Sequence, residues 1–154
     1  MKNHITLLLL LISFVSQSQD LSKIYEKVNP AVVEIITEEK VIVNNGSTTQ
    51  TGTSSGLGSG FMISDTQIIT AAHVVQIANK VVVRFLDGEE IPANVISSFS
   101  SADVALIELV WPRKNAVIVK LGDSDRAKIG SRVFVVGAPF GLGHSFSSGY
   151  VSGY

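Results

Sequence analysis

The chain has 154 residues, of which 45% are hydrophobic and 16% are charged. That apolar fraction excludes an intrinsically disordered chain, and the length suits about one domain of roughly 100–200 residues. The net charge of −1 gives no basic footprint for a nucleic-acid partner. The absence of cysteine excludes disulfides, thiolate nucleophiles and zinc fingers. Abundant valine and isoleucine favour strands over helices.

Residues 1–18 predict a secretory signal peptide. Lys2 gives a positive start, residues 5–15 are almost wholly apolar, and Ser16 and Ser18 form the small-x-small pattern of a cleavage site. As a helix the apolar run would reach roughly 16 Å, which is too short for a hydrocarbon core of ~30 Å. We therefore expect cleavage after Ser18 and a secreted mature chain without a membrane span.

The next segment predicts a short helix, then strands, then a loop. Residues 20–29 place apolar side chains at helical spacing, and Pro30 ends this predicted helix. Residues 31–43 are rich in β-branched side chains and predict one or two strands. Residues 44–59 contain only Gly, Ser, Thr, Asn and Gln apart from Leu57, so they offer little to a core. We expect a long, mobile surface loop there.

From Gly60 onward, short β-rich runs recur between turn signals. Asp87-Gly88 is the sharpest of these signals and predicts a two-residue hairpin turn. Only the short stretch that begins at Ala72-His73 interrupts the series with a helical pattern. Many short strands at even spacing predict an all-β sandwich or barrel. The predicted strands are residues 60–64, 67–72, 80–86, 91–98, 103–109, 116–121 and 132–137.

The histidines and one aspartate are the candidates for chemistry. His4 falls in the predicted signal peptide, and His144 lies in a Gly-rich stretch typical of a loop. His73 directly follows an apolar strand and two alanines, which allow close backbone packing around the ring. Asp103 begins an apolar strand, where a carboxylate is costly unless it is paired. Taken singly, the two have structural explanations, a satisfied strand-end histidine and a strand-entry cap.

A histidine followed by an aspartate in a secreted all-β chain suggests the general-base pair of a serine hydrolase. A serine hydroxyl is a poor nucleophile until an imidazole takes its proton. A neutral imidazole can accept that proton near working pH, and a carboxylate fixes its tautomer. His73 and Asp103 are therefore candidate catalytic residues, although spacing alone does not establish the pair.

Two other kinds of site have weaker support. A metal site built from His73, Asp103 and His144 has too few ligands with recognisable spacing, so we expect no metal. Three glycines at positions 56, 58 and 60 suggest a dinucleotide-binding loop, but Phe61 and a strand follow where a helix is needed. We expect no cofactor.

His73 stands in the string ITAAHVV and Asp103 in the string SADVALIEL. These strings resemble the trypsin-like serine proteases, and most closely the HtrA/Deg branch that bacteria secrete. The resemblance covers almost all of residues 21–154, and its two short motifs around His73 and Asp103 are specific in combination. Val74 occupies the place where disulfide-bearing relatives have a cysteine. The motifs are VNPAVVEI (28–35), GLGSGFMI (56–63), ITAAHVV (69–75), SADVALIEL (101–109), and GSRVFVVGAPFGLG with SSGYVSG (130–153).

The resemblance implies a double antiparallel β-barrel with the active site between the barrels. Residues 19–121 would form an N-terminal helix and the complete first barrel, and residues 122–154 the truncated start of the second. The implied function is that of a serine endopeptidase for protein quality control, with His73 and Asp103 catalytic. Its substrates would be unfolded or damaged proteins of the periplasm. Trimer contacts in relatives precede the first barrel, which leaves a homo-oligomer open here.

The sequence departs from the family pattern at the nucleophilic serine, which we do not find. The family places it in a Gly-x-Ser-Gly-Gly segment of the second barrel, which we expect beyond Tyr154. Ser59 precedes the histidine and is interpreted as a strand-start residue. The sequence thus predicts either the front portion of a longer protease or an inactive, protease-like peptide-binding module. The late serines lack the full pattern of flanking glycines; they are Ser145, Ser147, Ser148 and Ser152.

Overall fold

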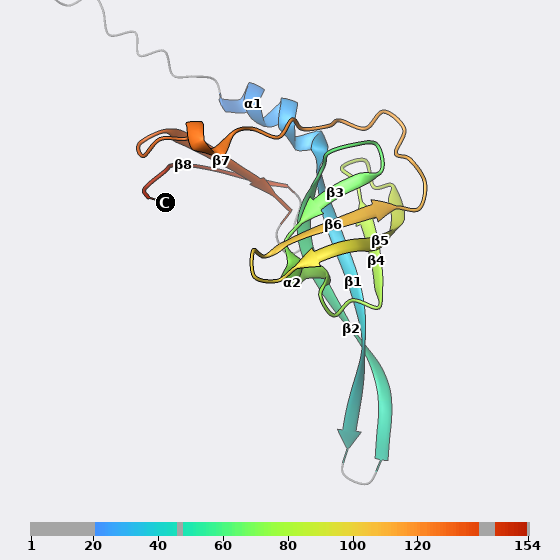
Figure 1. Ribbon diagram of the computed structural model, residues 1–154. Helices are drawn as coiled ribbons and strands as arrows, with labels where there is room; N and C mark the ends of the chain where they lie inside the picture. The colour runs from blue at the N-terminus through green and yellow to red at the C-terminus, as the bar shows by residue number, and fades with distance from the viewer. Residues whose placement is uncertain (1–20, 46–47, 139–143, 154) are drawn as a thin grey trace, which may run out of the picture.

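The computed structural model describes residues 21–45, 48–138 and 144–153. The predicted signal peptide and His4 lie outside these ranges. Within them, six strands close into one barrel and two more form a separate sheet beside it (Figure 1). No helix of the described part is long and apolar enough to cross a membrane.

The barrel strands follow the order β1-β2-β3-β6-β5-β4, and β1 pairs with β4 to complete the ring. All neighbouring pairs are antiparallel. Closure removes the unpaired edges that an open sheet would present. The strands are β1 (Val32–Asn45), β2 (Thr48–Met62), β3 (Gln67–Thr70), β4 (Lys80–Arg84), β5 (Glu90–Phe99) and β6 (Val104–Leu109); the short helix α2 (Ala72–Val75) follows β3.

A short helix and a second sheet lie together beside the barrel (Figure 1). Helix α1 (Leu21–Val28) and the 3-10 turn η2 (Asn29–Ala31) confirm the predicted N-terminal helix. The second sheet pairs β7 (Arg132–Gly137) with β8 (Ser145–Tyr150), and the 3-10 turn η3 (Ser124–Arg126) precedes it. This arrangement confirms the all-β class with one closed barrel, a short helix and the start of a second sheet.

The prediction of a loop at residues 44–59 is wrong. Most of this segment belongs to β2, which pairs with β1 from Phe61, opposite Val32, to Thr48, opposite Asn45. The pair extends from the barrel as a two-stranded arm (Figure 1). A strand needs backbone hydrogen bonds rather than large side chains, and the β-branched residues of β1 supply the strand-forming partner.

Glycines in β2 also have a packing role that their loop-like composition conceals. A Cβ at position 58 would lie 2.5 Å from a methyl carbon of Val74 on α2. A Cβ at position 60 would lie 2.7 Å from a side-chain carbon of Ile68. Only glycine allows β2 to approach α2 and β3 this closely.

Two further predictions need adjustment. The Asp87-Gly88 hairpin joins β4 to β5 as predicted, but Phe85 N–H donates to Glu89 O, so the loop has one more residue than expected. Gly88 takes the left-handed conformation at φ 87° that such a loop requires. Residues 116–121 do not form the predicted strand. A strand needs a ladder of backbone hydrogen bonds, and the bond described for this segment is a single one from Val119 N to Met62 O.

The segment that links barrel and second sheet is held by Arg113. Its guanidinium carbon lies 4.5 Å from the centre of the Phe85 ring, within the range of a cation–π contact. It also pairs with Asp87 and Glu89 on the β4–β5 hairpin, and its backbone N–H donates to Asp65 O at 2.8 Å. The link therefore follows the barrel surface.

The core lies inside the barrel. Side chains alternate along β1, so that Val33 and Ile35 are fully buried in the core while Glu34 belongs to the opposite face. Burial of such side chains contributes about 1.5–3 kcal/mol each. The largest fully buried side chains are Ile35, Met62, Ile68, Ile91, Ile107, Val33 and Val83.

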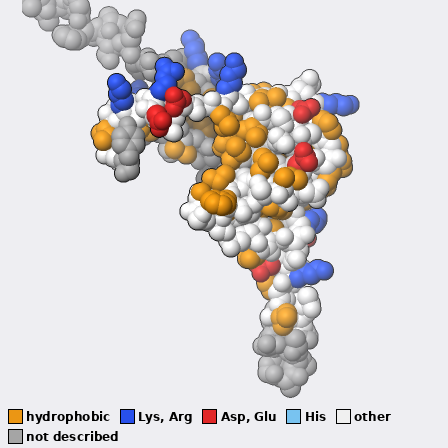
Figure 2. All heavy atoms as spheres, viewed as in Figure 1, with side chains coloured by type: hydrophobic (Ala, Val, Ile, Leu, Met, Phe, Trp, Pro, Cys, Tyr) orange, Lys and Arg blue, Asp and Glu red, His pale blue; other side chains and the backbone are white. Residues whose placement is uncertain are grey.

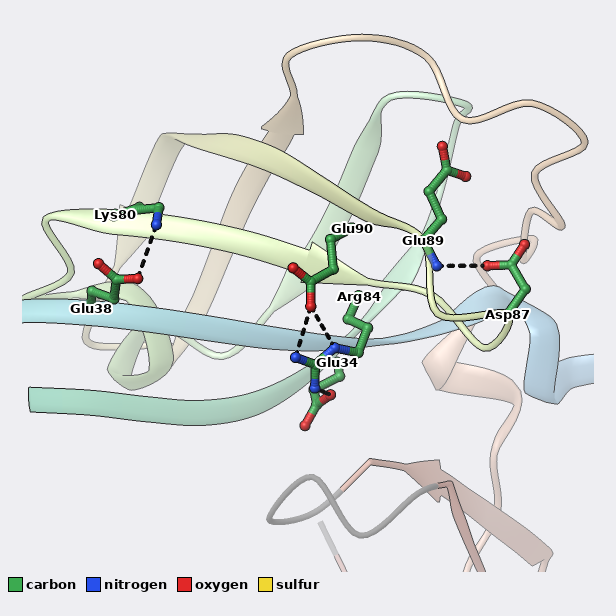
Figure 3. Close-up of polar contacts among 7 residues, drawn as sticks. All are labelled: Glu34, Glu38, Lys80, Arg84, Asp87, Glu89 and Glu90. Atoms are coloured by element: carbon green, nitrogen blue, oxygen red, sulfur yellow. Dashed lines mark hydrogen bonds and ion pairs between the residues drawn. The ribbon is translucent and has the colours of Figure 1, made fainter.

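Ion pairs connect three neighbouring strands on the outer face (Figure 3). Arg84 pairs with Glu34 on β1 at 2.9 Å and with Glu90 on β5 at 2.7 Å. The pKa of Arg84 is raised, and the hydrogen bond to Glu90 is the largest cause. Desolvation is the next influence and lowers this pKa, while the hydrogen bond to Glu34 raises it further. Figure 2 shows apolar side chains over the barrel face around β5 and β6, with Lys and Arg gathered near α1 and the second sheet.

We expect Ile35→Ala to lower the free energy of unfolding by about 2–5 kcal/mol, because it leaves a cavity in the core. Ile42→Ala is the matched control on the same strand, since Ile42 is 73% exposed. The control should change stability by at most about 0.5 kcal/mol. Urea unfolding followed by circular dichroism measures both variants. Equal losses in the two would contradict the inward placement of Ile35.

Candidate active site

His73 and Asp103 meet at one end of the barrel. The His73 Nδ1 atom lies 2.8 Å from Asp103 Oδ2 and 3.0 Å from Oδ1. The backbone N–H of His73 also donates to Asp103 Oδ1 at 3.0 Å. The carboxylate therefore contacts both the ring and the backbone of the histidine. Thirty positions separate the two residues in the sequence.

Strand pairing explains why these residues are neighbours. Strands β3 and β6 are antiparallel, with Thr70 opposite Ala105. His73 follows the end of β3, and Asp103 directly precedes β6. Because antiparallel neighbours place the end of one strand beside the start of the other, the two side chains emerge at the same rim.

Helix α2 holds His73 through its neighbours. Ala72 and Val75 are buried, and Val74 packs against β2 at Gly58. Ala71, the residue before the helix, provides no side-chain cap. The first N–H groups of a helix lack internal partners, and Asp103 accepts from one of them at His73. The carboxylate thus caps the helix as well as orienting the ring.

A tight turn presents Asp103. Backbone bonds run from Ala102 N to Phe99 O and from Asp103 N to Ser100 O, both at 3.2 Å. Asp103 itself has φ 50°, a left-handed conformation that non-glycine residues seldom adopt. Aspartate is among the residues that tolerate it best. Strained backbone of this kind is often associated with functional sites.

The surroundings of Asp103 stabilise its charged form. The backbone hydrogen bond from His73 is the largest influence, and the bond from the His73 ring is the next, so that together they lower the pKa of Asp103. Partial burial acts in the opposite direction and is weaker. Both side chains stay open to solvent, with 71% of His73 and 52% of Asp103 exposed.

A cavity of about 280 Å³ adjoins His73. One side is formed by the residues of α2 and the segment after it, and the other by the β1–β2 pair. Its wall is mixed, with serine and threonine hydroxyls beside apolar groups. The lining residues are Thr37, Glu39, Ser54, Ser55, Gly56, Leu57, His73, Val74, Ile77 and Ala78.

His144 lies beside α1 and η2 and does not join His73 and Asp103, the other two candidate metal ligands. Its ring Nδ1 forms a hydrogen bond with Asn29 Oδ1 of η2, and its carbonyl accepts from the Tyr25 hydroxyl of α1. Burial lowers the pKa of His144. In the described ranges no three His, Asp or Glu side chains gather where they could hold a metal ion.

The sequence did not indicate which polar groups connect the barrel to the second sheet. Ser59 Oγ accepts from the Ala138 N–H at 2.8 Å, across 79 positions of sequence. Tyr25 and Phe146 pack edge to face with ring centres 5.6 Å apart. Nothing in the pattern around Ser59 distinguishes it from other strand serines. Of the late serines, Ser145, Ser147 and Ser148 lie on β8 and Ser152 follows it.

Comparison with known proteins decides the family. A profile described as "Trypsin-like peptidase domain" matches residues 58–154, which include His73 and Asp103. The chain belongs to the trypsin-like peptidase family. Among its curated relatives, a probable periplasmic serine protease do/HhoA-like of Haemophilus influenzae is 33% identical over 91% of the chain. A probable periplasmic serine endoprotease DegP-like of Pseudomonas putida is 44% identical over 62% of it.

Solved structures give the same fold for this chain. An HtrA-type protease, AlgW with a tripeptide, superposes with a TM-score of 0.72 at 26% identity. The match covers 86% of this chain and 39% of that one. The chain spans only 36% and 20% of the lengths of the two curated relatives.

We expect His73→Ala to raise the pKa of Asp103 only part of the way to the ordinary value of about 3.9. The ring bond is lost, but the larger contribution, from the backbone N–H at position 73, remains. A carboxyl-carbon NMR titration measures the midpoint.

Asp87→Asn, a change in the β4–β5 loop, is the control and should leave the Asp103 midpoint in place. The pKa of Asp103 is lower in the folded chain than in the unfolded chain. Its contacts with His73 therefore stabilise the fold above the unfolded pKa, and this stabilisation is lost as pH falls through the folded pKa. An unchanged midpoint in His73→Ala would contradict the assigned ring contact.

Proposed function

We propose that this chain carries the proton-handling half of a serine endopeptidase site, with His73 as general base and Asp103 as its orienting carboxylate. The observation that supports this most strongly is the contact of both Asp103 oxygens with His73 Nδ1. Family membership supplies the reaction class. Residues 19–121 would be the first barrel with its helix, and residues 122–154 the start of the second.

The geometry suggests which ring nitrogen acts. Because the lowered pKa keeps Asp103 ionised, Nδ1 carries the proton that it donates to the carboxylate. Nε2 then has a free lone pair and can accept the proton of a serine hydroxyl. The serine oxygen forms a bond to the peptide carbonyl carbon, and the same proton passes to the leaving amine as the C–N bond breaks. Water hydrolyses the acyl-enzyme.

We infer that the nucleophile is a serine in the Gly-x-Ser-Gly-Gly setting of the family. The described serines of β8 do not supply it, because none has the Gly-x-Ser-Gly-Gly setting of the family. We also propose a periplasmic location, which is supported by relatives that are named as periplasmic serine proteases, and unfolded or damaged proteins as substrates.

We expect the secreted product of the complete gene to cleave denatured casein and to react with a serine-directed fluorophosphonate. His73→Ala should abolish cleavage, and Asp103→Asn should lower kcat by about 10³–10⁴-fold through the wrong ring tautomer. Lys80→Ala on β4 is the control and should keep full activity.

Retained cleavage in His73→Ala would refute the assignment. A product that binds peptides but never reacts with the fluorophosphonate would favour an inactive peptide-binding module instead.

The activity should fall as the solution becomes acidic, because a protonated imidazole cannot accept the serine proton. Asp103 does not cause this fall, since its lowered pKa keeps it charged to a more acidic pH. A profile of kcat/KM against pH measures the midpoint. Full activity at pH 5 would contradict the role of an imidazole base.

A further inference from the structure

A hydrogen bond between Ser59 of the barrel and Ala138 contributes to the contact between the barrel and the second sheet. Ser59 lies on β2 opposite Glu34 of β1, on the face that the second sheet adjoins. Its hydroxyl accepts from the N–H of Ala138, the residue that follows β7. Ala138 is 1% exposed, and the contact is partly buried. Water therefore competes poorly for this bond.

The backbone of the same residue contacts the strand that leads to His73. The carbonyl of Ser59 accepts from the Thr70 hydroxyl at 2.8 Å. Thr70 is the last residue of β3, three positions before His73. Gly58, next to Ser59, packs against Val74, which directly follows His73. Ser59 is thus bonded on one side to the segment that positions the histidine and on the other to the second sheet.

The chain packs closely around this hydrogen bond. Gly137 lies against Ser59, since a Cβ built there would be 3.5 Å from the Ser59 oxygen. An N–H donor at Ala138 without an acceptor would be buried and unsatisfied, which costs about as much as a lost hydrogen bond. An alanine at position 59 would leave it in that state.

We propose that Ser59 is a positioning residue that fixes the second sheet against the His73-bearing rim of the barrel. The consequence for catalysis rests on the proposed function, in which the second barrel brings the nucleophile to Nε2 of His73. A displacement of about 1 Å in such a site can cost roughly a hundredfold in rate. The placement itself is a property of the chain and can be measured without any activity.

Two measurements on the chain test the placement. Amide hydrogen exchange at Ala138 should become roughly fivefold faster in Ser59→Ala, the factor expected for one net hydrogen bond. Ser59→Thr keeps a hydroxyl and should restore the protection. Ser97→Ala, at an exposed serine of β5, is the matched control and should change nothing.

The second measurement is a distance distribution between spin labels. The sequence has no cysteine, so Ser98→Cys on β5 and Ser148→Cys on β8 provide unique labelling sites. We expect Ser59→Ala to broaden or shift the distribution between the two labels, and Ser59→Thr to keep it. An unchanged distribution, or unchanged exchange at Ala138, would overturn the proposal.

The activity of the complete gene product then tests the consequence. Ser59→Ala should lower kcat about tenfold to a hundredfold with KM nearly unchanged, and Ser59→Thr should rescue it. Unchanged kcat alongside a shifted distance distribution would overturn the positioning role. A wild-type product without any cleavage would refute the proposed function, while the exchange and distance measurements would still decide the placement.

Discussion

The site depends on one carboxylate that has two tasks. Asp103 binds the ring of His73 and also caps the first turn of α2 through the backbone N–H of the same residue. The helix lacks a side-chain cap of its own, so its start and the orientation of the ring depend on the same group. Since Asp103 directly precedes β6 and His73 follows β3, the pairing of these two strands brings the two side chains together.

Sequence reasoning found the pair but not what connects it to the rest. The types of residue and their order suggested a base and its carboxylate, and the family motifs made the suggestion specific. The contacts of Ser59 with Ala138 and of Asn29 with His144 had no signal, because each joins segments 79 or 115 positions apart through a single polar atom. Such contacts depend on how barrel and sheet are packed, and no local pattern encodes them.

The wrong loop prediction and the wrong strand prediction have opposite causes. Residues 48–59 have a loop-like composition yet form β2, because β1 offers a complete backbone partner and close packing at Gly58 and Gly60 excludes larger residues. Residues 116–121 have a strand-like composition yet form no strand, and the backbone bond described for them is the one from Val119 N to Met62 O. β-propensity describes how side chains fit a half-buried surface, and it does not supply a neighbour.

The first barrel provides geometry for the pair but not a dry environment. With 71% of His73 and 52% of Asp103 exposed, water screens their interaction, and electrostatic effects on a reacting group stay weak. Under the proposed function, the second barrel must therefore supply more than a nucleophile, since closing over the rim would exclude water and strengthen each charge there. Strand β1 takes part both in the core and in the contact with the second sheet. Its inward residues form the core, while Glu34, on the other face, lies opposite Ser59 at that contact.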